Sequence, residues 1–70
     1  MDANEEFILT YQHRPNGGRW KSVAEVFRDI EAARAHLDVF RADVEKRYGS
    51  IKNVTLLHPV TEGGRKVEPL

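Results

Sequence analysis

The chain has 70 residues, no cysteine, and eleven basic side chains balanced by eleven acidic ones. This length fits one small domain, and the lack of cysteine excludes disulfide bonds and thiolate metal sites. The neutral balance argues against a general polyanion binder, because nonspecific nucleic-acid binding usually accompanies a basic excess. The acidic first six residues and the absence of a long apolar run predict neither a signal peptide nor a membrane span. We therefore expect one cytoplasmic domain over residues 1–70, with flexible ends at 1–5 and 61–70.

The first predicted strand covers residues 7–13, which are rich in β-branched and aromatic side chains. The two-residue period of a strand puts Phe7, Leu9 and Tyr11 on one face. Residues 14–18 then end the strand, because their proline cannot donate to a β-ladder. The Asn-Gly-Gly run that follows supplies the positive φ angles of a tight turn. A β-hairpin is therefore predicted.

The second predicted strand covers residues 19–27 and has a weaker centre at 22–25, where a bulge or short irregular turn would fit. Basic and aromatic residues gather around the turn: His13, Arg14, Arg19, Trp20 and Lys21. On a β-ribbon such a set can hold phosphates and stack against bases. The alternative is that the charges protect an edge hairpin from aggregation while Trp20 packs in the core. We favour this structural interpretation, because a small core needs the volume of the only tryptophan.

A helix is predicted from Asp29 to Tyr48. Its apolar positions recur at steps of three and four and form one stripe: Ile30, Ala33, Leu37, Phe40, Val44 and Tyr48. Asp29 is the expected N-cap, because its carboxylate can accept a hydrogen bond from a first-turn amide. Gly49 is the expected left-handed residue that ends the helix after Tyr48.

Two further faces of this helix differ in chemistry. One is a row of alternating charge: Glu31, Arg34, Asp38, Arg41 and Glu45. Opposite charges lie three and four residues apart, so we expect a solvated row that neutralises itself. The outer face carries Ala32, Ala35, Val39 and Ala42. Helix propensity explains the alanines but not a β-branched valine, so a partner-binding surface is predicted there.

The third predicted strand covers residues 51–60 and ends near a proline. Residues 61–70 have one internal apolar side chain, so we expect a flexible tail, with a short fourth edge strand as the alternative. A helix of about 18 residues spans about 27 Å and can return the chain over a short sheet. The expected fold is α+β in ββαβ order, with a three-stranded antiparallel sheet (order 2-1-3) and one helix on one face. The other face stays open to solvent or to a partner.

No constellation for catalysis or metal binding is predicted. The three histidines, His13, His36 and His58, match no ligand spacing, although ends of neighbouring strands could bring His13 and His58 together. The two serines lie in no nucleophile motif, and no glycine-rich phosphate loop precedes the helix. We expect no enzymatic activity, no cofactor and no bound metal.

Over residues 7–60 the chain resembles small phage- and prophage-encoded accessory proteins, including some anti-CRISPR proteins. The shared features are length, a Tyr-x-His strand, a Gly-Gly-Arg-Trp hairpin, an Ala-rich charged helix and a closing Leu-Leu-His-Pro-Val strand. The resemblance implies a binder that occludes a larger host complex without catalysis. Such proteins often use acidic surfaces, and the neutral composition departs from that, so no functional residue is carried over.

These observations predict a non-catalytic module that binds and inhibits a larger protein or ribonucleoprotein partner through the outer helix face or the hairpin. The first alternative is a small nucleic-acid-binding protein that uses Arg14, Arg19, Trp20 and Lys21. The second is a homodimeric structural module. No membrane partner is expected.

Overall fold

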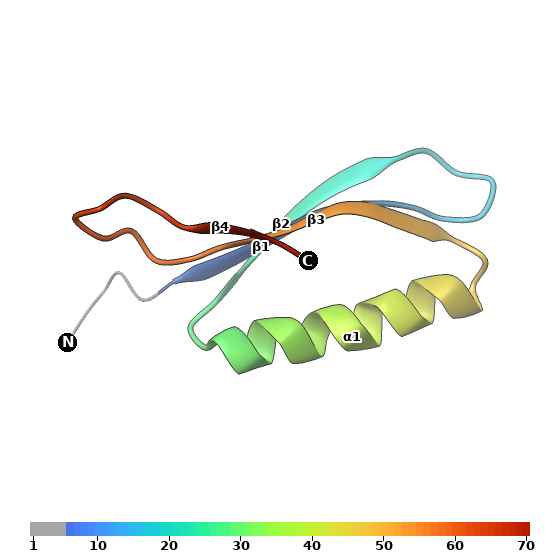
Figure 1. The fold of residues 1–70 in the computed structure, drawn as a ribbon. Helices are drawn as coiled ribbons and strands as arrows, with labels where there is room; N and C mark the ends of the chain where they lie inside the picture. Colours follow the sequence, from blue (N-terminus) through green and yellow to red (C-terminus); the bar gives the residue numbers. More distant parts are fainter. Residues whose placement is uncertain (1–5) are drawn as a thin grey trace.

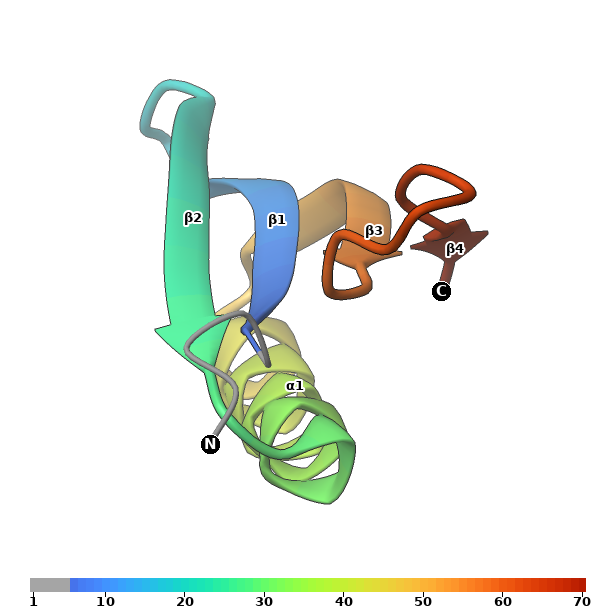
Figure 2. The ribbon, with the colours of Figure 1, turned by 90° about the vertical axis from the view of Figure 1, so that its left-hand side faces the viewer.

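The computed structural model describes residues 6–70, which form one antiparallel sheet and one helix. In chain order the elements are β1 (Phe7–Arg14), β2 (Lys21–Phe27), α1 (Ile30–Lys46), β3 (Ser50–Leu57) and β4 (Val67–Pro69). The strands lie in the order β2-β1-β3-β4, and α1 lies along one face of the sheet (Figures 1 and 2). The predicted α+β fold, with its 2-1-3 order and short fourth edge strand, is confirmed.

The hydrophobic core lies between α1 and the sheet face that it covers. Leu9 of β1 and Leu56 of β3 are directly opposite each other and fully buried. Tyr11 and Val54 extend the core along the same face, and the helix contributes Ala33, Leu37 and Val44. Complete burial of a leucine side chain contributes about 2 kcal/mol relative to exposure. This covered face therefore supplies most of the apolar burial in a very small domain.

The two ends of α1 confirm one capping prediction and correct the other. The Glu31 backbone N–H donates to Asp29 Oδ1 at 3.1 Å, so Asp29 is the N-cap as predicted. At the other end, Tyr48 itself has the positive φ of 59°, and its side chain is 82% exposed outside the apolar stripe. Gly49 is required for a different reason, because a Cβ there would lie 2.8 Å from the Arg14 carbonyl oxygen.

The irregularity in the sheet lies elsewhere than predicted. The pairing of β1 with β2 is regular from Phe7–Phe27 to His13–Lys21, so residues 22–25 contain no bulge. The bulge is between β1 and β3, where β3 has one extra residue between two paired positions. Asn53 lies in this segment with a φ of 53°, a left-handed conformation that asparagine tolerates better than most residues.

The expectation of a flexible tail over residues 61–70 is wrong for its last part. Residues 67–69 form β4, which pairs with β3 at the edge of the sheet. Glu68 fastens this strand, because its carboxylate lies 2.8 Å from Arg34 Nη2 and 2.9 Å from His58 Nε2. The hydrogen bonds with His58 and then Arg34 lower the pKa of Glu68 below its ordinary value. The expectation for residues 1–5 falls outside the described residues.

The charged row of α1 does not neutralise itself as predicted. Arg34 reaches off the helix to Glu68 rather than to Glu31 or Asp38. Within the described helix and its cap, the ion pair lies instead between Asp43 and Arg47, at 3.3 Å. Exposed ion pairs along one helix are worth only a few tenths of a kcal/mol. The carboxylate of Glu68 on β4 therefore competes easily with the helix carboxylates for Arg34.

Candidate functional site

The face of the sheet opposite α1, here called the uncovered face, carries an apolar row. In Figures 1 and 2, α1 lies on the other side of the sheet, and no helix of residues 6–70 covers this one. Because directly paired residues share a face, the pairing aligns four side chains across all four strands: Val26, Ile8, Leu57 and Val67. The two outer members, Val26 and Val67, are 58% and 56% exposed. An apolar row thus faces solvent from one edge of the sheet to the other.

Beyond this apolar row the uncovered face becomes progressively more polar. The next row contains small or neutral side chains: Ala24, Thr10, Thr55 and Pro69. The third row is a chain of hydrogen bonds across three strands. In it Asn53 Nδ2 donates to Gln12 Oε1 at 2.6 Å, and Gln12 Nε2 donates to Ser22 Oγ at 3.3 Å.

The hairpin end of the uncovered face holds a cation–tryptophan cluster, defined here as Arg14, Trp20 and Lys52. Lys52 Nζ lies 4.0 Å from the Trp20 ring centroid, and Arg14 Cζ lies 5.3 Å from it. Trp20 is 37% exposed, so the prediction that it packs in the core is wrong. The aromatic volume of the core comes instead from the buried Tyr11 and from three phenylalanines that pack against the core, Phe7, Phe27 and Phe40.

The structure brings together only part of the predicted hairpin site. Arg14 and Trp20 are joined, whereas Lys21 is exposed opposite His13 and thus belongs to the covered side of the sheet. Arg19 is exposed in the connection that precedes β2. Lys52 was missed, because its position beside Trp20 depends on the β1–β3 register and its bulge.

The sequence segments around this cluster lack acidic residues, although the net charge of the whole chain is zero. The sequence has no Asp or Glu between residues 7 and 24, or between residues 46 and 61. Within the described residues, neither Arg14 nor Lys52 has a carboxylate at ion-pair distance. The two carboxylates of the strands, Glu25 and Glu68, pair with Leu9 and Leu56 and so lie on the covered face. The hairpin end of the uncovered face is therefore locally cationic.

The predicted outer face of α1 is solvent-exposed at all four of its positions: Ala32, Ala35, Val39 and Ala42. Val39 is 71% exposed. This face presents one valine among three alanines, which is less apolar surface than the row on the sheet. Its role as a partner-binding surface stays a prediction.

The histidines are separated by the fold. His13 pairs with Ile51, whereas His58 follows the strand end that pairs with Ile8, so the two lie at opposite ends of the sheet. His58 contacts Glu68, and His36 Nε2 lies close to Glu25 Oε2 without making a hydrogen bond to it. Within residues 6–70, no three metal-binding side chains gather in one place. The idea that His13 and His58 meet is therefore wrong.

Tyr11 is the buried phenol of the covered face. Burial raises its pKa, and the negative charge of Glu25 on the neighbouring strand raises it further. Tyr11 lies in an aromatic group with Phe40 and His13 beneath α1. This group explains the packing of the covered face, and the absence of catalysis stays a prediction.

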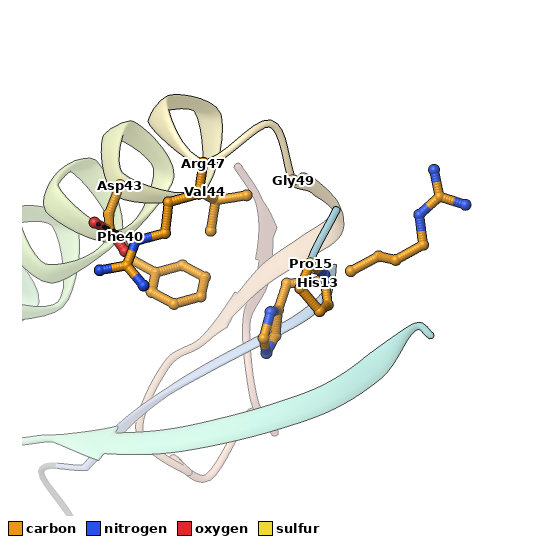
Figure 3. A pocket seen from close by; sticks show the side chains of 8 residues that line it. His13, Pro15, Phe40, Asp43, Val44, Arg47 and Gly49 are labelled. Carbon is orange, nitrogen blue, oxygen red and sulfur yellow. Dashed lines mark ion pairs between the residues drawn. The ribbon is translucent and has the colours of Figure 1, made fainter. Parts of the chain in front are cut away.

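A small pocket opens between the C-terminal end of α1 and the end of β1 (Figure 3). His13 and Pro15 line its strand side, and Phe40, Asp43 and Arg47 line its helix side. Its volume of about 230 Å³ is below the usual range for small-molecule sites, about 300–1,000 Å³. Asp43 and Arg47 in its lining already pair with each other, and Arg14 also lines it. The uncovered face is the stronger candidate site.

One feature of the sequence does indicate the apolar row. Val26-Phe27 and Leu56-Leu57 are adjacent apolar pairs, so both faces of the sheet must be apolar at that end. Strict alternation would have left one member of each pair polar.

Comparisons with protein-family models, curated proteins and solved structures found no match to this chain. In the described part of the chain, the helix is too short and too polar to span a membrane.

Proposed function

We propose that this protein is a non-catalytic binding module that uses the uncovered face of its sheet to bind a larger protein or ribonucleoprotein. The observation that carries the proposal is the exposed apolar row across all four strands. Side chains such as Val26 and Val67 gain about 25 cal/mol for each Å² of apolar surface that a partner removes from water. Contiguous apolar surface rimmed by polar groups is typical of protein-binding sites.

The remainder of the uncovered face supports the same function. Tryptophan and arginine are enriched among residues that dominate binding energy, and Trp20 and Arg14 lie on this face. The rows between them and the apolar row are small or uncharged, so a partner could cover the whole face without burying an unpaired carboxylate. Inhibition of the partner by occlusion, as the anti-CRISPR resemblance implies, stays a prediction.

The test compares two exposed valines on opposite sides of the molecule. Tagged wild-type protein, Val26→Asp and Val39→Asp are used to capture partners from cells, and the captured proteins are quantified by mass spectrometry. We expect wild type and Val39→Asp to capture the same partner and Val26→Asp to lose it. Circular dichroism confirms that both variants are folded.

The reverse pattern, with loss only in Val39→Asp, would move the site to the outer face of α1. The mass of wild type and of Val26→Asp, measured under native conditions, would reveal a third possible result. A wild-type dimer that Val26→Asp converts to a monomer would show that a second copy of this chain covers the sheet.

A further inference from the structure

We infer that the cation–tryptophan cluster is a binding site for single-stranded nucleic acid. Trp20 stacks against a base, and Arg14 and Lys52 contact phosphates. The inference deepens the proposed function, because it names a component of a ribonucleoprotein partner. The apolar row and the cluster involve different residues, so the two proposals can fail separately.

The only tryptophan of the sequence lies outside the core. A small core gains most from its largest apolar side chain, yet Trp20 lies on the uncovered face with over a third of its surface in water. It is held there by two cations rather than by core residues. An aromatic ring on a sheet surface can stack with any base, because every base has a π-face.

The two cations of the cluster lack a counter-charge among the described residues. Arg14 and Lys52 have no carboxylate partner within the described residues, and neither flanking stretch of sequence contains an acid. Arg19 adds an exposed cation beside Trp20 in the sequence, whereas Lys21 lies on the covered side of the sheet. Backbone phosphates would supply the anions that the protein itself does not provide.

A polar row lies beside the cluster. Gln12, Ser22 and Asn53 lie next to it on the uncovered face and already hydrogen-bond to one another. Amide side chains of this type can bond to base edges once a base stacks on the neighbouring ring.

These features favour a single strand over other polyanions. Bases inside a duplex are already stacked, so they offer no free face to a ring on a sheet surface. An acidic peptide would satisfy Arg14 and Lys52 but would leave Trp20 without a stacking partner. Duplex and acidic peptide are therefore the decisive competitors in the test.

The experiment uses the fluorescence of Trp20, which reports from the proposed site alone because no other tryptophan is present. The protein is titrated with oligothymidine and with oligouridine of about ten nucleotides at low salt. We expect saturable quenching by at least one of them. Affinity should fall between about 50 and 200 mM salt.

Variants are measured by the anisotropy of a labelled oligonucleotide, which does not depend on Trp20. Trp20→Leu should bind about tenfold more weakly, as expected for one lost base stack, and Trp20→Phe should recover part of the loss. Arg14→Ala with Lys52→Ala should weaken binding and reduce the slope of log affinity against log salt by about 1.4. The matched control, Arg65→Ala with Lys66→Ala, removes the same charge outside this cluster and should bind like wild type.

Three results would overturn the inference. They are no binding at low salt, equal weakening in the Arg65/Lys66 control, or equal affinity for duplex DNA or polyglutamate. The Val26→Asp variant separates the two proposals, because it should lose the captured protein and keep oligonucleotide binding.

Discussion

The two faces of the sheet differ in how their charges are used. On the covered face, both strand carboxylates have partners: Glu25 faces His36, and Glu68 contacts Arg34 and His58. On the uncovered face, Arg14 and Lys52 contact an aromatic ring. The side chains of Glu25 and Glu68 are 39% and 25% exposed, so pairing offsets the cost of their partial removal from water. Arg14 and Lys52 have no carboxylate partner among the described residues, so they remain available to bind an anion.

The largest difference in stability between substitutions on the two faces is expected for two neighbouring leucines of β3. Leu56 is fully buried against α1, whereas Leu57 lies on the uncovered face. Leu56→Ala should lower the free energy of unfolding by about 3 kcal/mol, and Leu57→Ala by about 1 kcal/mol. Urea unfolding curves of both variants, fitted with one common dependence of the unfolding free energy on urea concentration, give both values. Equal losses would mean that the uncovered face contributes to folding as much as the core does.

A smaller effect on stability, one that depends on pH, is expected from Glu68. Its pKa is lower in the folded state than its ordinary value of 4.5, so its contribution to stability is present above that value. The contribution is lost as the pH falls through the lower, folded-state pKa. Glu68→Gln should reduce stability at neutral pH and should flatten this acid dependence, measured by urea midpoints against pH. An unchanged acid profile would show that the contacts with Arg34 and His58 do not stabilise β4.

The smallest effect on stability is expected from Tyr11, at alkaline pH. Its pKa is raised above 10.0 in the folded state, so the folded protein keeps a phenol proton that the unfolded chain releases. Stability should therefore decline as the pH rises from 10.0 towards the raised pKa. In Tyr48→Phe, which leaves Tyr11 as the only tyrosine, tyrosinate absorbance should appear at higher pH in native protein than in urea. Coincident curves would contradict the burial of this phenol.

Local patterns predicted most of the elements. The period of two in residues 7–13, the apolar stripe of the helix and the Asp29 cap are set by neighbours within a few residues, so they can be seen in one sequence. The strand order also followed, because a hairpin, one helix and a third strand leave few ways to pair.

The candidate site was only partly predictable. Arg14 and Trp20 are close in the sequence and were singled out, but Lys52 joins them through pairing between distant strands. Gly49 was recognised as necessary for the wrong reason, because its close contact is with the Arg14 carbonyl on another element.

Periodicity and capping are local, so the helix, the main strands and an α+β fold with one open face could be predicted from the amino-acid sequence alone. The residues that make up the open face depend on how the strands pair. The pairing of strands aligns Val26, Ile8, Leu57 and Val67 into one row, and it directs both strand carboxylates to the helix side. Tyr11 and the three phenylalanines supply the aromatic packing of the core, and Trp20 lies on the surface beside two cations. These outcomes depend on contacts between residues far apart in the chain, which no local pattern encodes.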